Sequence, residues 1–283
     1  MKFLDVKTDY AFKKVFGSKN SKSILISFLN AVIDFPKNRK IESLEIVDPY
    51  NIPMIKGMKD TFLDVKAILD NDTDVIIEMQ ILNVEGFEQR VLYNAAKKYS
   101  HQLSKGDNYK LLNPIIALTI VNFEMFPQFE KVISNFIMIE KEKFVKYSDD
   151  VELIFIELTK FKKTLEELEN ITDEWLYFIK NAEDLTLVPE NVDDKIKDAL
   201  NIVNEAGMSV EELELQHKRK DFIMLQKGSI IKAVKDAVKD AVKDTKNKRS
   251  KEIAINLLDV LDNKTISIKT GLDILEVEKL RNK

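Results

Sequence analysis

Two acidic residues and an amide stand in an otherwise apolar part of the sequence. Asp64 belongs to one strand-like segment, Thr61–Lys66, and Glu78 and Gln80 belong to a second one, Val75–Gln80. Because side chains alternate along a strand, Glu78 and Gln80 share one face of the expected sheet. Carboxylates on an apolar strand are costly to bury without a partner such as a cation. The pattern therefore indicates that Asp64 and Glu78 could hold a divalent metal, which would favour an enzyme.

The same acids also have a simpler interpretation. An aspartate close to Lys66 is often a solvated residue on an open sheet face, and Glu78 could simply pair with a lysine. Arg90 and Tyr93 lie one turn apart on the next expected helix, so they could reach back to an anionic ligand or orient the acids. These two residues raise the odds of a functional site.

The composition limits the kind of metal site. The 283 residues include no cysteine and only two histidines, which excludes thiolate sites, disulfides and a multi-histidine centre within one chain. Any metal would be held by carboxylates, which points to Mg²⁺ or Mn²⁺. No apolar run reaches the length of a membrane span, and the N-terminus lacks the apolar core of a signal peptide. We expect a soluble, cytoplasmic protein without a membrane partner.

The elements that must position the acids form an α/β pattern. Residues 8–33 read as two helices broken at Gly17, and residues 85–103 read as an amphipathic helix. A turn, Asp70–Thr73, joins the two acid-bearing strands. The chain turns helical beyond Thr159. Strands are expected at 41–47, 61–66, 75–80, 114–123, 135–139 and 153–158, with the 114–123 strand central and buried on both faces.

Charge divides the second half of the chain. Residues 149–217 carry nineteen acidic and six basic side chains, whereas residues 218–251 carry four acidic and twelve basic ones. We predict a core at 1–160, an acidic helical region at 161–226, and a basic helical repeat with a small helical module at 227–283.

The basic block repeats Ala-Val-Lys-Asp three times from Ala233. A solvated helix or self-association stem is the favoured interpretation, and a phosphate-binding arm is the alternative. The arm's candidate DNA-binding residues are Lys235, Lys239, Lys243, Lys248 and Arg249.

The ordered motifs of the first half resemble the PD-(D/E)xK nuclease superfamily, and more narrowly the bacterial family of recombination-promoting nucleases or putative transposases. The matching segments are Asp9-Tyr-Ala-Phe-Lys-Lys-Val-Phe-Gly17, Phe28-Leu-Asn30, Lys59-Asp60 with Asp64, Ile77-Glu-Met-Gln80, Phe87-Glu-Gln-Arg-Val-Leu-Tyr93 and Gly106-Asp-Asn-Tyr109. The C-terminal half is similar to the variable tails of that family, but less specifically.

The resemblance implies a restriction-endonuclease-like fold, a mixed β-sheet core flanked by helices, followed by an all-helical C-terminal region. It implies that Asp64 and Glu78 bind Mg²⁺ or Mn²⁺ and that Met79 offers its backbone carbonyl. Gln80 stands where the family motif normally has a lysine. Gln80 would position water without supplying charge. Lys66, on the same face as Asp64 by alternation, could supply the missing charge.

Asp9 matches the acid of the family's first motif helix, and Arg90 and Tyr93 are expected to support the site or contact phosphate. The implied function is a Mg²⁺-dependent DNA endonuclease linked to recombination, transposition or phage defence. The partners would be DNA and a second copy, with a homodimer or higher homo-oligomer formed through the helical half. The alternatives are a catalytically weak or inactive nuclease fold that binds DNA or assembles, and a nuclease that acts on RNA.

Overall fold

A computed structural model describes residues 1–35, 39–47, 50–51, 61–62 and 64–282. The chain divides into two compact units, Met1–Ile223 and Met224–Lys283. The motif segment Lys59-Asp60 lies outside the described residues.

A mixed sheet forms the centre of the first unit. Its strands are β1 Leu44–Val47, β4 Val65–Leu69, β5 Asp74–Gln80, β6 Ile115–Val121, β7 Ile133–Phe136 and β8 Val151–Glu157. They are ordered β1-β4-β5-β6-β8-β7, and β2 Tyr50–Asn51 with β3 Thr61–Phe62 forms a separate two-stranded sheet. β5, β6 and β8 run parallel, and the other pairs of the large sheet are antiparallel. β6 is buried along its whole length, as a central strand covered on both faces must be.

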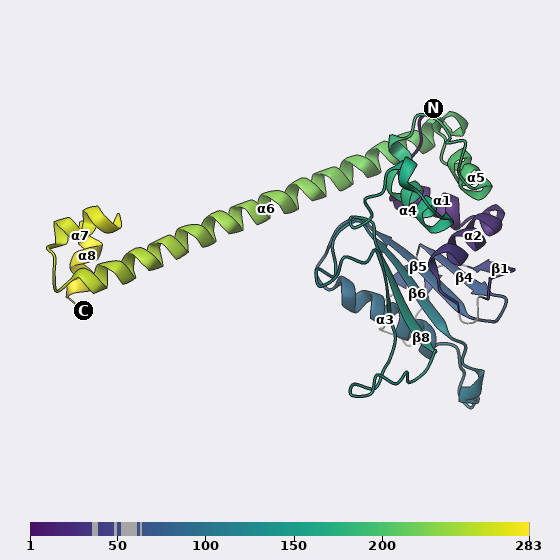
Figure 1. The fold of residues 1–283 in the computed structure, drawn as a ribbon, viewed down its shortest axis with the longest axis horizontal. Helices are drawn as coiled ribbons and strands as arrows, with labels where there is room; N and C mark the ends of the chain where they lie inside the picture. The colour runs from purple at the N-terminus through teal and green to yellow at the C-terminus, as the bar shows by residue number, and fades with distance from the viewer. Residues whose placement is uncertain (36–38, 48–49, 52–60, 63, 283) are drawn as a thin grey trace. The chain divides into compact units, whose positions relative to one another are not determined.

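Helices cover both faces of this sheet (Figure 1). The covering helices are α1 Asp9–Phe16, α2 Lys22–Val32, α3 Phe87–Ser100, α4 Ile171–Asn181 and α5 Asp194–Ile202. The chain continues with α6 Val210–Leu257, α7 Asn263–Thr270 and α8 Ile274–Arg281. α3 packs on one face through side chains such as Val91 and Ala95, while α1, α2, α4 and α5 enclose the main core on the other. The predicted α/β fold with a mixed sheet and a helical C-terminal region is confirmed.

The acid-bearing strands differ in extent from the prediction. β4 begins after Asp64 and continues to Leu69, where the predicted turn follows. Asp72 has a φ of 64° and donates its N–H to the Leu69 carbonyl, and the Leu69 N–H bonds the Thr73 carbonyl. The left-handed residue is an aspartate, a type that tolerates this conformation. This tight turn places Asp64 opposite Glu78 in the antiparallel pair.

The predicted strand at 135–139 is shifted toward the N-terminus. β7 starts at Ile133 and ends at Phe136. The chain beyond Phe136 pairs with its own continuation instead of with β8. Tyr147 donates its N–H to the Met138 carbonyl, and Glu140 donates its N–H to the Val145 carbonyl. Local hairpin pairing therefore replaces the last residues of the expected strand.

α1 is fixed closely against the sheet beside Asp64. The Thr8 hydroxyl caps the helix by accepting the Ala11 N–H, and Phe12 and Phe16 are fully buried in the main core. Gly17 follows the helix at a point where a Cβ would lie 2.9 Å from the Lys13 carbonyl oxygen and 3.4 Å from Val65. A Cβ there would crowd the last turn of α1 itself, because the 2.9 Å approach is to a carbonyl of that helix, whereas the contact with Val65 of β4 is an ordinary one.

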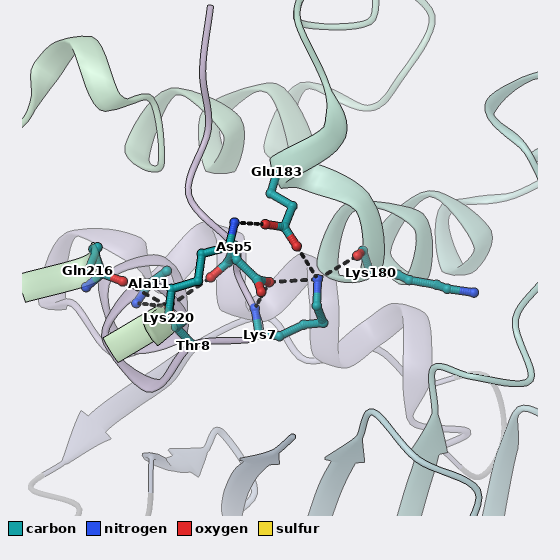
Figure 2. Close-up of polar contacts among 8 residues, drawn as sticks. All are labelled: Asp5, Lys7, Thr8, Ala11, Lys180, Glu183, Gln216 and Lys220. Carbon is teal, nitrogen blue, oxygen red and sulfur yellow. Dashed lines mark hydrogen bonds and ion pairs between the residues drawn. The ribbon is translucent and has the colours of Figure 1, made fainter. Parts of the chain in front are cut away.

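A group of polar contacts, here called the α1–α6 latch, joins the region of α1 to the first turns of α6 (Figure 2). Buried Thr8 donates a hydrogen bond to Gln216, and Lys220 forms an ion pair with Glu183. Glu183 also faces the buried ammonium of Lys7 at 3.5 Å. Lys7 completes its bonding with Asp5 and the Lys180 carbonyl, so its charge is satisfied inside the protein.

Two further contacts complete the α1–α6 latch on the exposed side of α1. Asp9 forms an ion pair with Arg219, and Glu212 accepts hydrogen bonds from Tyr10 and Lys14. The first turns of α6 are thus attached to the α1 region from Thr8 to Lys14.

The second unit is entirely helical. Ala254, Ile266, Leu272 and Val277 form its small core, and Gly271, with a φ of 72°, ends α7. In α6, by contrast, Val234, Val238 and Val242 of the repeat are exposed. Within the described residues, no helix is both long enough and apolar enough to cross a membrane.

Candidate functional site

Asp64 lies immediately before β4 with its side chain only 14% exposed. Its Oδ2 accepts the backbone N–H of Met79 at 2.8 Å, which fixes the carboxylate over β5. Its Oδ1 faces the Nζ of Lys13 from α1 at 3.4 Å. The carboxylate is therefore held by β5 on one oxygen and faces a helix-borne cation with the other.

Glu78 projects from β5 toward α3, and its side chain is also 14% exposed. The guanidinium of Arg90 forms an ion pair with it. Asn94, one turn further along α3 and almost completely buried, adds a side-chain hydrogen bond. Residues four apart share a helix face, so α3 presents both partners to the same carboxylate.

Gln80 is engaged within the protein at both ends of its amide. Its Oε1 accepts a hydrogen bond from Arg90 at 2.9 Å, and its Nε2 donates to the Leu82 carbonyl at 2.7 Å. Arg90 thus connects Glu78 and Gln80, which lie on one face of β5 as strand alternation predicts. The amide contributes no charge to the site and retains one N–H for another acceptor.

Burial dominates the electrostatics of both acids. Burial raises the pKa of Asp64, while the hydrogen bond from the Met79 N–H and the charge of Lys13 lower it. Burial also raises the pKa of Glu78; Arg90 opposes the rise, and the negative charge of Asp64 adds to it. The negative charge of each carboxylate therefore bears on the environment of the other, and a neighbouring cation opposes the rise in pKa at each.

The donor set suits a hard divalent cation. Mg²⁺ is commonly held by one or two carboxylates and completes its octahedron with water and phosphate oxygens rather than with an all-protein cage. Asp64 and Glu78 supply such a pair of carboxylates. Among the described residues, no group of three or more histidine, aspartate or glutamate side chains is placed to hold a metal. Hence any ion at this pair would depend on waters, a backbone carbonyl or the substrate.

The other candidates from the core occupy different positions. Lys66 is half-buried on β4, opposite Ile76 and two residues beyond Asp64. Met79 has its side chain in the main core and its backbone beside Asp64. Asp9 lies at the start of α1, where it is paired with Arg219 and raises the pKa of Asp64 through its charge. Tyr93 is partly exposed on α3.

The candidate DNA-binding residues lie on α6, which runs through the boundary between the two units. They are exposed along the helix: Lys235, Lys239, Lys243, Lys248 and Arg249. Their DNA contact stays a prediction, as do the roles of the candidates in the core.

Sequence reasoning missed two residues that contact the acids. Lys13 was part of a motif but was given no role, because its contact joins residues 51 positions apart in sequence. Asn94 had a usable signal, since it follows Arg90 by four residues and is a polar residue on the buried face that Val91 and Ala95 form.

The chain was compared with known proteins. The family model for the PD-(D/E)XK nuclease family transposase matches residues 6–233, which include α1, the sheet and the first turns of α6. No curated protein and no solved structure matches the chain. Since the match spans most of the sequence, the chain belongs to the PD-(D/E)XK nuclease family transposases.

Proposed function

We propose that this protein is a metal-dependent endonuclease that hydrolyses phosphodiester bonds of DNA. The observation that carries the proposal is the pair of shielded carboxylates: Glu78 on β5, and Asp64, which precedes β4 and is bonded to the N–H of the residue after Glu78. Family membership supports a nuclease and a divalent metal. Mg²⁺ or Mn²⁺ at this pair would supply Lewis acidity and lower the pKa of a bound water.

The protein's own groups would prepare this site. Met79 fixes Asp64 through its N–H, and its carbonyl is the proposed backbone ligand. Arg90 and Asn94 orient Glu78, and Gln80 has an N–H left with which to orient water. Tyr93 is proposed to face the phosphate, and Lys66 is the candidate that the sequence offers for the missing charge. Because burial disfavours the charge of each carboxylate, a bound cation would be stabilised by both of them.

A plasmid-nicking assay tests the proposal. Supercoiled DNA is incubated with the protein and Mg²⁺ or Mn²⁺, and the Asp64→Asn and Glu78→Gln variants are compared with the unsubstituted chain. We expect nicking that requires the metal and falls by at least about 10²-fold in each variant. Glu88→Gln is the matched control, since Glu88 is an exposed acid on α3 near Arg90. Equal nicking by the two site variants and the control would contradict the proposal.

A non-catalytic DNA-binding protein of the same fold is the second candidate function. The engaged, uncharged Gln80 favours it, because the position lacks the charge that a lysine would bring. DNA binding without nicking in any variant would support this candidate. An RNA substrate in the same assay decides between the two nucleic acids.

Biological role and assembly extend the proposal. A metal-dependent endonuclease of this family would act in the cytoplasm, in recombination, transposition or defence against phage. Cutting both strands with one site per chain requires two copies, and α6 with its exposed valines is the proposed contact between them.

A further inference from the structure

The residue at the third motif position supplies no cation that could face a phosphate. Gln80 carries no charge there, and its amide is bonded to Arg90 and to the Leu82 carbonyl. Arg90 is itself bound to Glu78 and Gln80 at once. The charge that stabilises a phosphoryl group during hydrolysis must then come from another element.

Lys13 stands at the other acid. Its Nζ is 3.4 Å from the Oδ1 of Asp64, and its side chain is 44% exposed. Oδ2 already accepts the Met79 N–H, so Oδ1 is the Asp64 oxygen open to a divalent cation. A metal ion bound at Oδ1 would replace the positive charge that Lys13 now provides.

The backbone that carries Lys13 is held in place. Thr8 caps the start of α1, Gly17 lets its end approach Val65, and the α1–α6 latch attaches the helix to the root of α6 (Figure 2). Lys13 therefore has a fixed backbone and an exposed ammonium. A long side chain on a fixed helix can change partners without movement of the fold.

We propose that Lys13 is the cationic group of this site: it balances Asp64 while no divalent cation is bound, and it faces the phosphate once one is bound. This inference rests on the proposed nuclease function. It differs from the prediction for Lys66, because Lys13 comes from another element and has an observed contact with Asp64.

The test measures metal affinity and cleavage separately. Mn²⁺ binding to the metal-free full chain is followed by electron paramagnetic resonance without DNA, and nicking is measured at saturating Mn²⁺. Lys13→Met is expected to bind Mn²⁺ about two- to fivefold more tightly, because it removes a competing cation of an exposed pair. The same variant is expected to nick about 10²-fold more slowly.

Lys13→Arg keeps the charge and is expected to bind Mn²⁺ like the unsubstituted chain while restoring part of the cleavage. Lys22→Met, which removes an exposed lysine at the start of α2, is the matched control and should change neither quantity. Lys66→Met is measured alongside. If Lys66→Met, and not Lys13→Met, binds Mn²⁺ more tightly and nicks more slowly, the cation is Lys66 and the inference is wrong.

A purely structural role for Lys13 would lower Mn²⁺ affinity and cleavage together. The inference is overturned if Lys13→Met lowers both quantities, leaves Mn²⁺ affinity unchanged or leaves cleavage unchanged. Each of these outcomes leaves the nuclease proposal standing. If Mn²⁺ binding in the unsubstituted chain is absent or does not depend on Asp64, the nuclease proposal itself fails, so the two failures are distinguishable.

Discussion

Asp64 and Glu78 are ionisable groups that the fold shields from water. Burial raises the pKa of each above its ordinary value. A carboxyl group whose pKa is higher in the folded state favours folding while it is protonated, and this contribution is lost as the pH rises through the folded pKa. At neutral pH without metal, both groups therefore oppose folding.

We predict that Asp64→Asn stabilises the metal-free protein at neutral pH. An asparagine keeps an oxygen for the Met79 N–H and removes the shielded charge. The melting temperature in a chelating buffer is expected to rise by about 2–4 °C, and the gain should shrink as the pH falls toward the ordinary pKa of aspartate. Glu88→Gln should show no such pH-dependent gain. A lower melting temperature for Asp64→Asn at neutral pH would contradict the prediction.

At the scale of elements, the placement of α1 decides whether Lys13 meets Asp64. The contact requires the end of α1 to lie close to β4, where a Cβ at Gly17 would come 3.4 Å from Val65. Two separate sequence motifs, the first helix and the acidic strand, thus become one site only through a close approach of backbones.

We predict that Gly17→Ala weakens both stability and the site. The new Cβ would lie 2.9 Å from a backbone oxygen, so α1 must shift. The free energy of unfolding in urea should fall by about 1–3 kcal/mol. Nicking should fall as well because Lys13 moves with the helix. Gly207→Ala is the control, since a Cβ at Gly207 meets nothing within 4 Å; equal effects of the two substitutions would be inconsistent with this account.

Glu212 in the α1–α6 latch leads to a prediction about acid stability. Hydrogen bonds from Lys14 and Tyr10 lower its pKa from 4.5 to about 2. A lowered pKa stabilises the fold above the unfolded-state pKa, and this contribution is lost as the pH falls toward 2. Glu212→Gln should therefore be less stable than the unsubstituted chain at neutral pH and approach it at about pH 3 in urea unfolding. Glu214→Gln, two residues along α6, should follow the unsubstituted chain at both pH values.

The elements were largely predictable from sequence, because helix and strand periodicity is local. The Asp70–Thr73 turn, and the position of Asp64 opposite Glu78 across two neighbouring strands, followed from short-range patterns. The Lys13 contact and the α1–α6 latch did not, since they depend on how distant elements pack. For Asn94, the four-residue spacing from Arg90 could be recognised in the sequence. Its burial against Glu78 could not, because it depends on the docking of α3.

At the scale of the whole molecule, α6 carries two candidate surfaces on one helix. The repeat exposes valines at Val234, Val238 and Val242, together with a row of lysines. An apolar stripe favours association with another helix, and a lysine row favours phosphate. Substitutions can separate these two contributions.

We predict that Val234→Ser, Val238→Ser and Val242→Ser together reduce self-association. The exposed apolar stripe is the part of α6 that another helix would cover, so its loss should shift the mass measured by light scattering toward the single chain. Circular dichroism controls for helix content. An unchanged mass would remove α6 as the contact between copies.

We predict that Lys235→Gln, Lys239→Gln and Lys243→Gln together weaken DNA binding without changing self-association. Three lost phosphate contacts should reduce the slope of log affinity against log salt by about 3. Binding is measured by fluorescence anisotropy at several salt concentrations. A slope equal to that of the unsubstituted chain would show that these lysines do not contact phosphate.

The α1–α6 latch also orders events during translation. Its hydrogen bonds join residues as far as 198 and 210 positions apart, and Leu4 donates its N–H to the Val203 carbonyl. The segment that emerges from the ribosome early thus meets its partners only after most of the first unit has been made. A chain that stops before Ser209 contains Asp64, Glu78 and Lys13 but leaves α1 without its attachment to α6. Premature termination would therefore yield both acids of the site together with a Lys13 whose helix nothing from α6 holds in place.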